Sequence, residues 1–248
     1  MELLDLDEDS QMEIFSYFSF DELILLAAVC ARFLHLCQRH LRKIRYFELD
    51  YRAITSCAYY EERLQNIFRI LGPTMEAFRL SGGYIMDEKL KQAIVDNVAK
   101  YCTSLRHLTL NYTILTEQHL RPLEALLRTL VSLDLGRCDL TDVSLAEFLQ
   151  SQPSLPLRTL AIPGNPNLTG AFFANWTNCP SLEQLDLSYC FSLNVDRMEE
   201  FLKHAKRLAA VDATGSLWLQ RNKDIFQKEG RFIAMGTDLP ELKYFKSA

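Results

Sequence analysis

Residues 130–140, LVSLDLGRCDL, set the architecture, because their pattern of leucines returns three more times along the chain. The other copies are LRHLTL at 105–110, LRTLAIPGN at 157–165 and LEQLDLSYCFSL at 182–193. Within each copy apolar residues stand two apart, which predicts a short strand with one buried face, and a helix-spaced run follows. The step between copies lies inside the window of roughly 20 to 29 residues that is typical of one class of stacked repeats. The sequence therefore predicts a solenoid.

A small polar or thiol side chain follows each of these strands. The turn after a strand leaves backbone carbonyls facing inward, and a buried carbonyl needs a hydrogen-bond donor. We expect these donors to be Thr113, Cys138, Asn165 and Cys190.

Cysteines also mark the starts of copies, with CTSL at 102–105 and CPSL at 179–182. Together with Cys138 and Cys190 at strand ends, they make the repeats similar to the cysteine-containing leucine-rich repeats of the F-box/LRR family. The resemblance implies an α/β fold in which a short helical module packs on a leucine-rich-repeat solenoid. A curved parallel sheet would line its inside and helices its outside.

Composition and charge argue against several other classes of protein. A chain of 248 residues, 48% of them hydrophobic, can bury a substantial core, and a net charge of -5 gives no whole-chain reason to expect nucleic acid. The amino terminus carries acids where a secretory signal needs bases, and no apolar run reaches membrane-spanning length. Seven cysteines without a Cys-x-x-Cys pair fit reduced thiols. We expect a soluble protein of the cytoplasm or nucleus, without disulfides, nucleic-acid partner or membrane.

Residues 1–45 do not share the repeat and are dense in apolar side chains. The patterns Ser10-x-x-Glu13 and Ser19-x-x-Glu22 are capping boxes, which predict two helix starts. The first helix is apolar on both faces, and three short helices cannot bury all of this surface among themselves. Part of it is therefore expected to meet another protein.

Four strings in this module, LDED at 6–9, IFSYF at 14–18, DEL at 21–23 and AVCARF at 28–33, resemble the F-box. In that family the module docks onto the Skp-type adaptor subunit of a cullin-based ubiquitin ligase. An interpretation compatible with this one makes the module a helical cap that shields the first repeat. The residues expected to contact the adaptor are Leu3, Leu4, Leu6, Ile14, Phe15 and Val29.

Three residues depart from the usual F-box pattern. Asp7 stands where proline is usual, and Ser10 and Gln11 replace usual apolar residues. If these positions face the adaptor, the changes weaken its binding, and Gln11→Leu should strengthen it.

The chain divides into three predicted parts: the module at 1–45, leucine-rich repeats at 46–213 and a carboxy-terminal segment at 214–248. Alternation over 47–51 and 75–80 predicts two strands ahead of the four copies. No flexible linker separates the module from the repeats, so the first strand should pack directly on the helices. The segment 214–248 either caps the last repeat or folds back along the concave face to help form a binding site.

The search for chemistry finds no signature of an enzyme. Phosphate-loop, nucleophile-elbow and zinc-protease motifs are absent from the sequence. Cys30, His35, Cys37 and His40 are potential zinc ligands, but at about 100° per residue they cannot converge from one helix. A catalytic pair of Cys102 with His107 is less favoured than packing, because the repeat pattern calls for a small buried residue at position 102. We expect no catalytic residue, cofactor or metal.

Function is therefore expected to come from surfaces, above all from the concave strand face that leucine-rich solenoids offer. The candidate target-binding residues are Arg79, Asp134, Asp186 and Asp212, which occupy one column of that face together with Thr109 and Ala161. Two interpretations of the three aspartates stand open. They are either solvated charges at an exposed position, or a ladder of like charge that holds a basic segment of a target.

These observations lead to one main functional hypothesis. The chain is expected to be a non-catalytic substrate receptor of an SCF-type ubiquitin ligase, with the module on the adaptor and the repeats on a target protein. The alternative is a protein-interaction scaffold or inhibitor that works through its repeats without any ligase.

Overall fold

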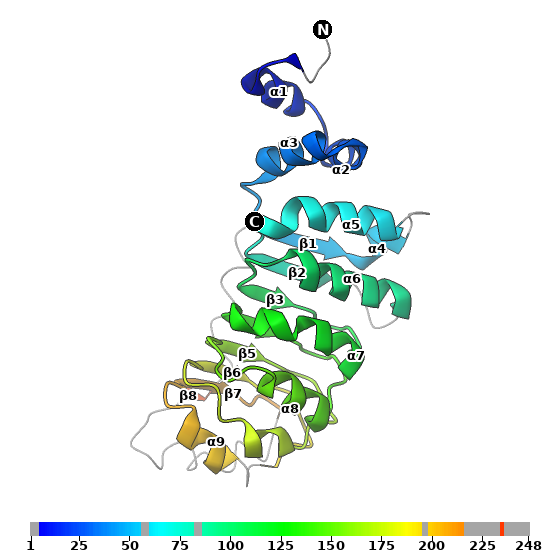
Figure 1. Cartoon of the computed structure of the whole chain (residues 1–248). Helices are drawn as coiled ribbons and strands as arrows, with labels where there is room; N and C mark the ends of the chain where they lie inside the picture. Colours follow the sequence, from blue (N-terminus) through cyan, green and yellow to red (C-terminus); the bar gives the residue numbers. More distant parts are fainter. Residues whose placement is uncertain (1–4, 56–59, 82–85, 195–197, 216–233, 236–248) are drawn as a thin grey trace. The chain divides into compact units, whose positions relative to one another are not determined.

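The computed structural model describes residues 5–55, 60–81, 86–194, 198–215 and 234–235 (Figure 1). The chain forms two compact units. The first unit contains Met1–Leu80 and Met86–Leu105, and the second contains Ser81–Ile85 and Arg106–Ala248. The division falls at Leu105, inside the range predicted for the repeats, while the predicted parts 1–45, 46–213 and 214–248 stay predictions.

The first unit begins with three helices, α1 (Glu8–Phe15), α2 (Phe20–Val29) and α3 (Ala31–Leu41). The capping box predicted at the start of α2 is confirmed, because the Glu22 carboxylate accepts from Ser19 N at 2.8 Å and Ser19 Oγ accepts from Glu22 N at 3.4 Å. The capping box predicted at Ser10 is wrong. Asp7 caps α1 instead, since its carboxylate accepts from Ser10 N at 2.9 Å and its charge suits a helix amino terminus.

The rest of the first unit alternates strands with helices. The strands predicted over 47–51 and 75–80 are confirmed as β1 (Tyr46–Asp50) and β2 (Ala77–Ser81), and between them α5 (Tyr60–Leu71) ends directly before Gly72. A Cβ on Gly72 would lie 2.8 Å from Tyr101 Cβ, so only glycine allows this close approach. The elements are β1 (Tyr46–Asp50), α4 (Tyr51–Thr55), α5 (Tyr60–Leu71), the 3₁₀ helix η2 (Gly72–Thr74), β2 (Ala77–Ser81) and α6 (Glu88–Tyr101).

The three amino-terminal helices and the first strand share one core. The ring of Phe20 in α2 lies 6.1 Å from that of Phe47 in β1, and Phe47 in turn stacks on Phe78 of β2 at 6.4 Å. Helix α5 packs against both α2 and α3, and Gln38 of α3 donates to the carbonyl of Arg69 at 2.8 Å. The expectation that the first strand packs directly on the helical module is confirmed.

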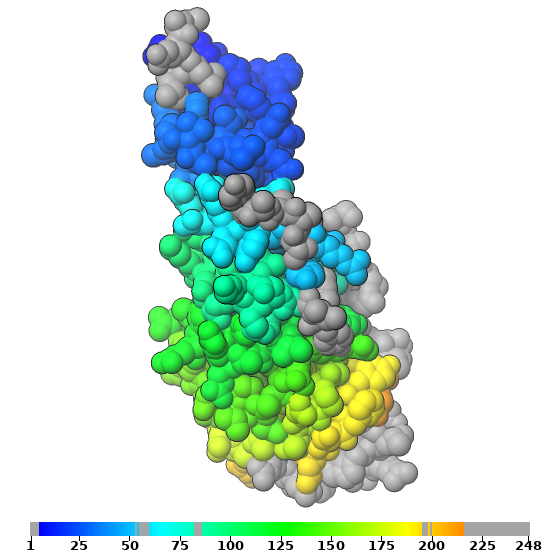
Figure 2. Space-filling view, turned by 90° about the vertical axis from the view of Figure 1, so that its right-hand side faces the viewer, coloured from blue at the N-terminus to red at the C-terminus, as the bar shows by residue number. Residues whose placement is uncertain are grey.

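The second unit contains parallel strands β3 to β8, in which each strand from β4 onward pairs with the strand before it in sequence. Equivalent residues lie 24 to 27 positions apart, and helices α7 and α8 lie on one face of the strands (Figure 1). In the space-filling view the repeats form adjoining bands of colour from green to yellow (Figure 2). The elements are β3 (His107–Thr109), α7 (Glu117–Leu120), η3 (Arg121–Arg128), β4 (Ser132–Asp134), α8 (Asp142–Gln150), β5 (Thr159–Ala161), η4 (Ala171–Asn175), β6 (Gln184–Asp186), α9 (Met198–His204), β7 (Ala210–Asp212) and β8 (Ala234–Met235).

The predicted α/β arrangement of parallel strands and returning helices is confirmed in this unit, with one difference. Strand β8 (Ala234–Met235) lies in the predicted carboxy-terminal segment 214–248, beyond the range predicted for the repeats. It pairs with β7 at the usual step, because backbone pairing needs no leucines. Residues 216–233 and 236–248, and with them most of the carboxy-terminal segment, lie outside the described residues.

Of the four donors predicted after the strands, Thr113 donates to the carbonyl of Asn111 in its own turn at 3.3 Å, and the other three bond to the preceding repeat. Cys138 Sγ donates to the carbonyl of Leu110 at 3.0 Å, and Cys190 Sγ donates to that of Ile162 at 3.2 Å. Asn165 Nδ2 donates to the carbonyl of Leu135 at 3.0 Å, one repeat earlier. Each of these three side chains satisfies a buried backbone group and joins two neighbouring repeats.

Candidate interaction surfaces

Helix α2 carries exposed apolar side chains opposite its buried face. Leu25 is 71% exposed and Val29 is 67% exposed, whereas Leu23 and Ala27 are buried. Residues four apart lie on one side of a helix, so Leu25 and Val29 form one apolar stripe, which we call the α2 stripe. A stripe of this kind suits contact with another protein.

The predicted adaptor contacts lie in different environments. Val29 is exposed, and Leu6 and Ile14 are half-buried. Phe15 is fully buried, with the rings of Phe18 and Phe33 about 6 Å away, so it offers no surface to a partner and its assignment is corrected to the core. Leu3 and Leu4 lie outside the described residues.

Sequence reasoning missed Leu25, although a signal was present. In the run from Leu23 to Val29 every residue is apolar, so the helix period alone does not say which side is buried. Leu25 and Val29 share a spacing of four that is out of phase with Leu23 and Ala27. That second phase was the signal for an outward apolar stripe.

Two of the three departures from the F-box pattern have local structural roles. Gln11 is fully buried and donates from Nε2 to the carbonyl of Leu6 at 3.0 Å, so it does not present a surface where leucine would add contacts. Asp7 caps α1, and its hydrogen bonds with Ser10 lower the pKa of its carboxyl group. The expectation that Gln11→Leu strengthens adaptor binding is therefore dropped.

In the second unit one column of strand residues runs across the repeats, and we call it the strand column. Thr109, Asp134, Ala161, Asp186 and Asp212 are direct register partners, so the predicted alignment of the three aspartates is observed. Their role in binding a target stays a prediction. Arg79, the fourth predicted residue, lies in the first unit, where its guanidinium is 4.0 Å from Glu48.

Each aspartate of the strand column closes the turn that follows its strand. Asp134 accepts from Gly136 N at 3.0 Å, Asp186 from Ser188 N at 2.9 Å and Asp212 from Thr214 N at 2.8 Å. This is the Asx-turn geometry, in which a side chain bonds the backbone two residues on. The recurrence of aspartate therefore has a structural cause that is independent of any ligand.

The carboxylates of this column are half-buried, unlike the solvated charges of the first interpretation. Burial raises the pKa of Asp186 above its ordinary value, hydrogen bonds from Ser188 oppose this, and the charge of Asp212 on the neighbouring strand raises it further. Ionised Asp186 is therefore less favourable in the folded state than in the unfolded state.

A pH-dependent stability follows from the raised pKa of Asp186. Because its folded pKa lies above its unfolded one, the ionised carboxylate destabilises the fold above the folded pKa, and this effect disappears as the pH falls through that value. We expect Asp186→Asn, which keeps an acceptor for Ser188 N, to raise Tm near neutral pH, and the gain to shrink as the pH falls through the raised pKa of Asp186. Thermal unfolding of parent and variant across this range measures it, and a gain that is the same at both ends contradicts the assignment.

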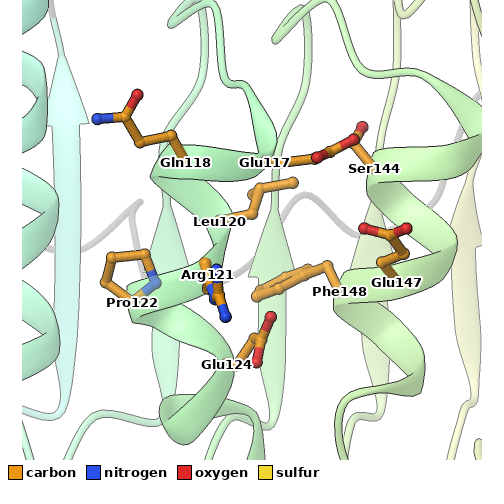
Figure 3. Close-up of a pocket in the computed structure, with 9 residues that line it drawn as sticks. All are labelled: Glu117, Gln118, Leu120, Arg121, Pro122, Glu124, Ser144, Glu147 and Phe148. Carbon is orange, nitrogen blue, oxygen red and sulfur yellow. The ribbon is translucent and has the colours of Figure 1, made fainter.

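The outer face of the second unit has a cavity of about 750 Å³ between η3 and α8 (Figure 3). Phe148 of α8 points toward Arg121 and Glu124 of η3. The one hydroxyl in the lining, that of Ser144, bonds to Thr141 as part of the cap of α8. The cavity thus brings no nucleophile and base together. Its lining consists of Glu117, Gln118, Leu120, Arg121, Pro122, Glu124, Ser144, Glu147 and Phe148.

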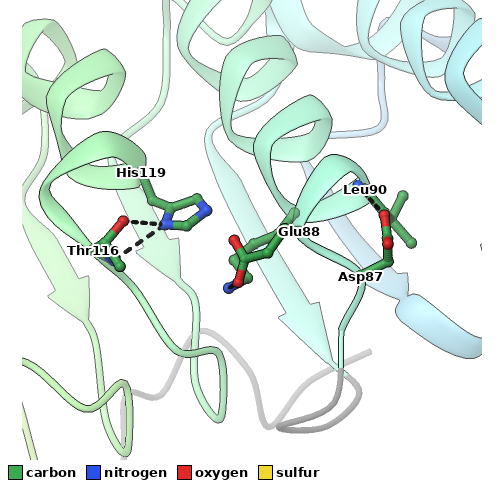
Figure 4. Close-up of polar contacts among 6 residues, drawn as sticks. Asp87, Glu88, Leu90, Thr116 and His119 are labelled. Carbon is green, nitrogen blue, oxygen red and sulfur yellow. Dashed lines mark hydrogen bonds and ion pairs between the residues drawn. The ribbon is translucent and has the colours of Figure 1, made fainter.

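Titratable side chains elsewhere serve in caps and packing. His119 is 2% exposed, and its Nδ1 accepts from Thr116 N at 3.1 Å, which caps α7 (Figure 4). In the first unit, Asp87 accepts from Leu90 N at the start of α6 (Figure 4). Burial raises the pKa of Cys102 to about 12, which keeps this thiol protonated and unreactive.

Three further properties hold for the described part of the chain. Within it, no group of histidine, cysteine and acidic residues is arranged to hold a metal ion. None of its helices has the length and apolar character to cross a bilayer. Its six cysteines, Cys30, Cys37, Cys102, Cys138, Cys179 and Cys190, are free thiols.

Comparison with known proteins identifies the amino-terminal helices. Residues 3–45 match the F-box domain. No curated protein matches the chain. Among solved structures, a chain in the crystal structure of the Rad7 and Elc1 complex in yeast is similar, with 14% identity and a TM-score of 0.34. The alignment covers 72% of this chain and 60% of that one, so this chain spans less than two thirds of the yeast chain's length.

Proposed function

We propose that this protein is a substrate-recognition subunit of a cullin-based, SCF-type ubiquitin ligase. Its F-box binds the Skp-type adaptor, and its leucine-rich repeats bind the target protein. The observation that carries the proposal is the F-box at residues 3–45, the kind of domain that joins receptors to this adaptor. The protein itself is non-catalytic in this scheme, and other subunits transfer ubiquitin.

The α2 stripe is the part of the F-box that we assign to the adaptor. Leu25 and Val29 are each about two-thirds exposed, and fully burying a side chain of this size contributes about 1.5 to 3 kcal/mol. Binding energy in interfaces is concentrated in a few such anchors. Ile14 and Leu6, which are half-buried, complete the proposed contact set among the described residues.

The compartment we propose is the cytoplasm or the nucleus. The six cysteines among the described residues are free, five of them buried, and this suits a reducing environment, because thiols in oxidising compartments are mostly paired.

Substitutions that introduce charge into the α2 stripe test the proposal. We expect Leu25→Glu combined with Val29→Glu to weaken adaptor binding about 100-fold, since losing about 3 kcal/mol of apolar burial corresponds to two factors of ten. Both side chains are exposed, so Tm should stay close to that of the parent. The measurement is calorimetric titration with purified adaptor, together with copurification of adaptor and cullin from cells.

Val143→Glu is the matched control, because Val143 is an exposed aliphatic residue (60%) on α8, outside the F-box. It should leave adaptor binding unchanged. If the parent binds the adaptor and the double variant binds it equally well, the contact surface does not include α2. A parent that fails to copurify with adaptor and cullin would instead favour the repeat scaffold or inhibitor without a ligase.

A further inference from the structure

A row of left-handed residues follows the strands of the second unit. Tyr112, Arg137, Gly164, Tyr189 and Gly215 occupy the same place in five successive repeats, with φ of 58°, 55°, 64°, 58° and 79°. Tyr112 N, Arg137 N, Gly164 N and Tyr189 N each donate to a carbonyl of the next repeat at 2.7 to 3.0 Å. The left-handed conformation is therefore imposed by the backbone ladder and does not depend on the side chain.

Tyrosine and arginine are unfavourable choices at such a place. A Cβ strains a left-handed backbone, and glycine or asparagine adopts it far more readily. Gly164 and Gly215 show that two repeats close the same turn without a side chain. Tyr112, Arg137 and Tyr189 occupy such strained positions, and positions of this kind concentrate at functional sites.

At the amino-terminal end of the row the side chains of Tyr112 and Arg137 contact each other. The guanidinium of Arg137 lies over the ring of Tyr112, 5.1 Å from its centroid. The same side chain crosses Gly164, where an added Cβ would lie 2.7 Å from Arg137 Cγ. Tyr112 thus has an internal cation on its ring.

At the other end, aromatic rings stand at the surface beside acidic strands. Tyr189 is 46% exposed and Phe191 is 67% exposed, and their rings make an edge-to-face pair at 6.4 Å. Tyr189 lies on Gly215, where an added Cβ would be 2.8 Å from its ring. This packing uses one side of the tyrosine and leaves nearly half of it to solvent.

Two carboxylates belong to the same end. Asp186 and Asp212 are direct partners on β6 and β7, and like charges directly opposite each other are unfavourable. Thr214 connects them to the rings, because its N–H donates to Asp212 at 2.8 Å and its carbonyl accepts from Tyr189 N at 2.7 Å. Carboxylates beside exposed aromatic rings attract a cation by both ion pairing and cation–π contact.

We propose that one surface patch is a docking site for an arginine- or lysine-bearing segment of a protein target. This β6–β7 patch consists of Asp186, Tyr189, Phe191 and Asp212. A basic side chain lying over the two carboxylates would offset the repulsion of the paired aspartates and reach the tyrosine ring. The inference rests on the proposed role of the repeats in target binding and is independent of the adaptor.

The test uses the purified full chain and three fluorescent twelve-residue peptides. All share a background of glycine, serine and leucine, and carry four arginines, four lysines or four glutamates. We expect fluorescence anisotropy to show binding of both basic peptides, with arginine stronger, and none of the acidic one. Raising the salt concentration should weaken the binding.

Tyr189→Asn removes the ring while suiting the left-handed backbone. We expect it to weaken binding of the arginine peptide about tenfold while Tm stays within about 2 °C of the parent or rises. Tyr112→Asn is the matched control, with the same residue and the same φ of 58°. It should leave peptide binding unchanged, because the ring of Tyr112, although 43% exposed, already carries the guanidinium of Arg137. Asp186→Asn with Asp212→Asn, which keeps the acceptors of both turns, should weaken binding at low salt and reduce its salt dependence.

Several results would overturn the proposal. They are equal binding of acidic and basic peptides, no binding at all, an unchanged affinity in Tyr189→Asn, or a large fall in its Tm, which would make the ring structural. Sedimentation is also decisive: if the parent chain is a dimer that Tyr189→Asn dissociates, the β6–β7 patch binds a second copy of the chain instead. None of these measurements contains the adaptor, so this failure is separate from failure of the ligase proposal.

Discussion

Replacing Asn165 by leucine should lower the free energy of unfolding of the second unit by about 4 kcal/mol or more. Asn165 is fully buried and bridges two repeats. Its Nδ2 donates to the carbonyls of Leu135 and Ile162 at 3.0 and 2.9 Å, and its Oδ1 accepts from the backbone N of Cys138 and of Leu140, each at 3.0 Å. Leucine satisfies none of these groups, and each buried group left without a partner costs about 1 to 3 kcal/mol.

Denaturant unfolding followed by circular dichroism measures this effect. Asn167→Leu is the control, because Asn167 lies two residues away, is exposed and bonds to Asp139 at 2.7 Å. Surface changes of this kind stay within about 0.5 kcal/mol, with one exposed hydrogen bond adding about 1 kcal/mol. If the two variants lost the same stability, Asn165 would not be the bridge between repeats that its hydrogen bonds indicate.

Replacing Phe15 by alanine should lower the free energy of unfolding of the first unit by about 3 to 5 kcal/mol. The side chain is fully buried at the end of α1, with Phe18 edge-on at 6.0 Å and Phe33 at 6.1 Å. Its removal leaves a cavity that these rings cannot fill. We expect adaptor binding to be lost only under conditions in which the variant unfolds.

The measurement pairs a denaturant titration of Phe15→Ala with adaptor binding at low temperature, where most of the variant is still folded. Phe15→Leu, which keeps most of the apolar volume, serves as the control and should lose less stability. A Phe15→Ala variant that is as stable as the parent yet does not bind the adaptor would restore Phe15 as a contact residue. That result would also move the contact surface from the α2 stripe to α1.

Apolar side chains of the amino-terminal helices are buried in one case and exposed in another. The sequence marks Phe15 and Val29 alike as apolar residues of an F-box-like module, yet one is buried and the other is two-thirds exposed. Experiments that replace Phe15 by a charge would confuse unfolding with loss of contact. Those that charge Leu25 and Val29 separate the two effects.

The sequence by itself determined the repeat. Alternating leucines predict β3 to β6 in the observed register, because a strand with one buried face needs apolar residues two apart. It also determined the inward donors Cys138, Asn165 and Cys190, since a repeated turn leaves the same carbonyl exposed to the interior each time. These features depend on local chain geometry, which the order of residues contains.

Only the tertiary structure decided which apolar residues remain outside. The run from Leu23 to Val29 in α2 is entirely apolar, and the packing of α3 and α5 against the helix, from later in the chain, leaves Leu25 and Val29 exposed. The turn-closing role of Asp186 and the left-handed backbone of Tyr189 likewise depend on hydrogen bonds that a list of residues does not contain. Burial and backbone conformation at these sites are set by contacts between distant segments, which residue spacing alone does not determine.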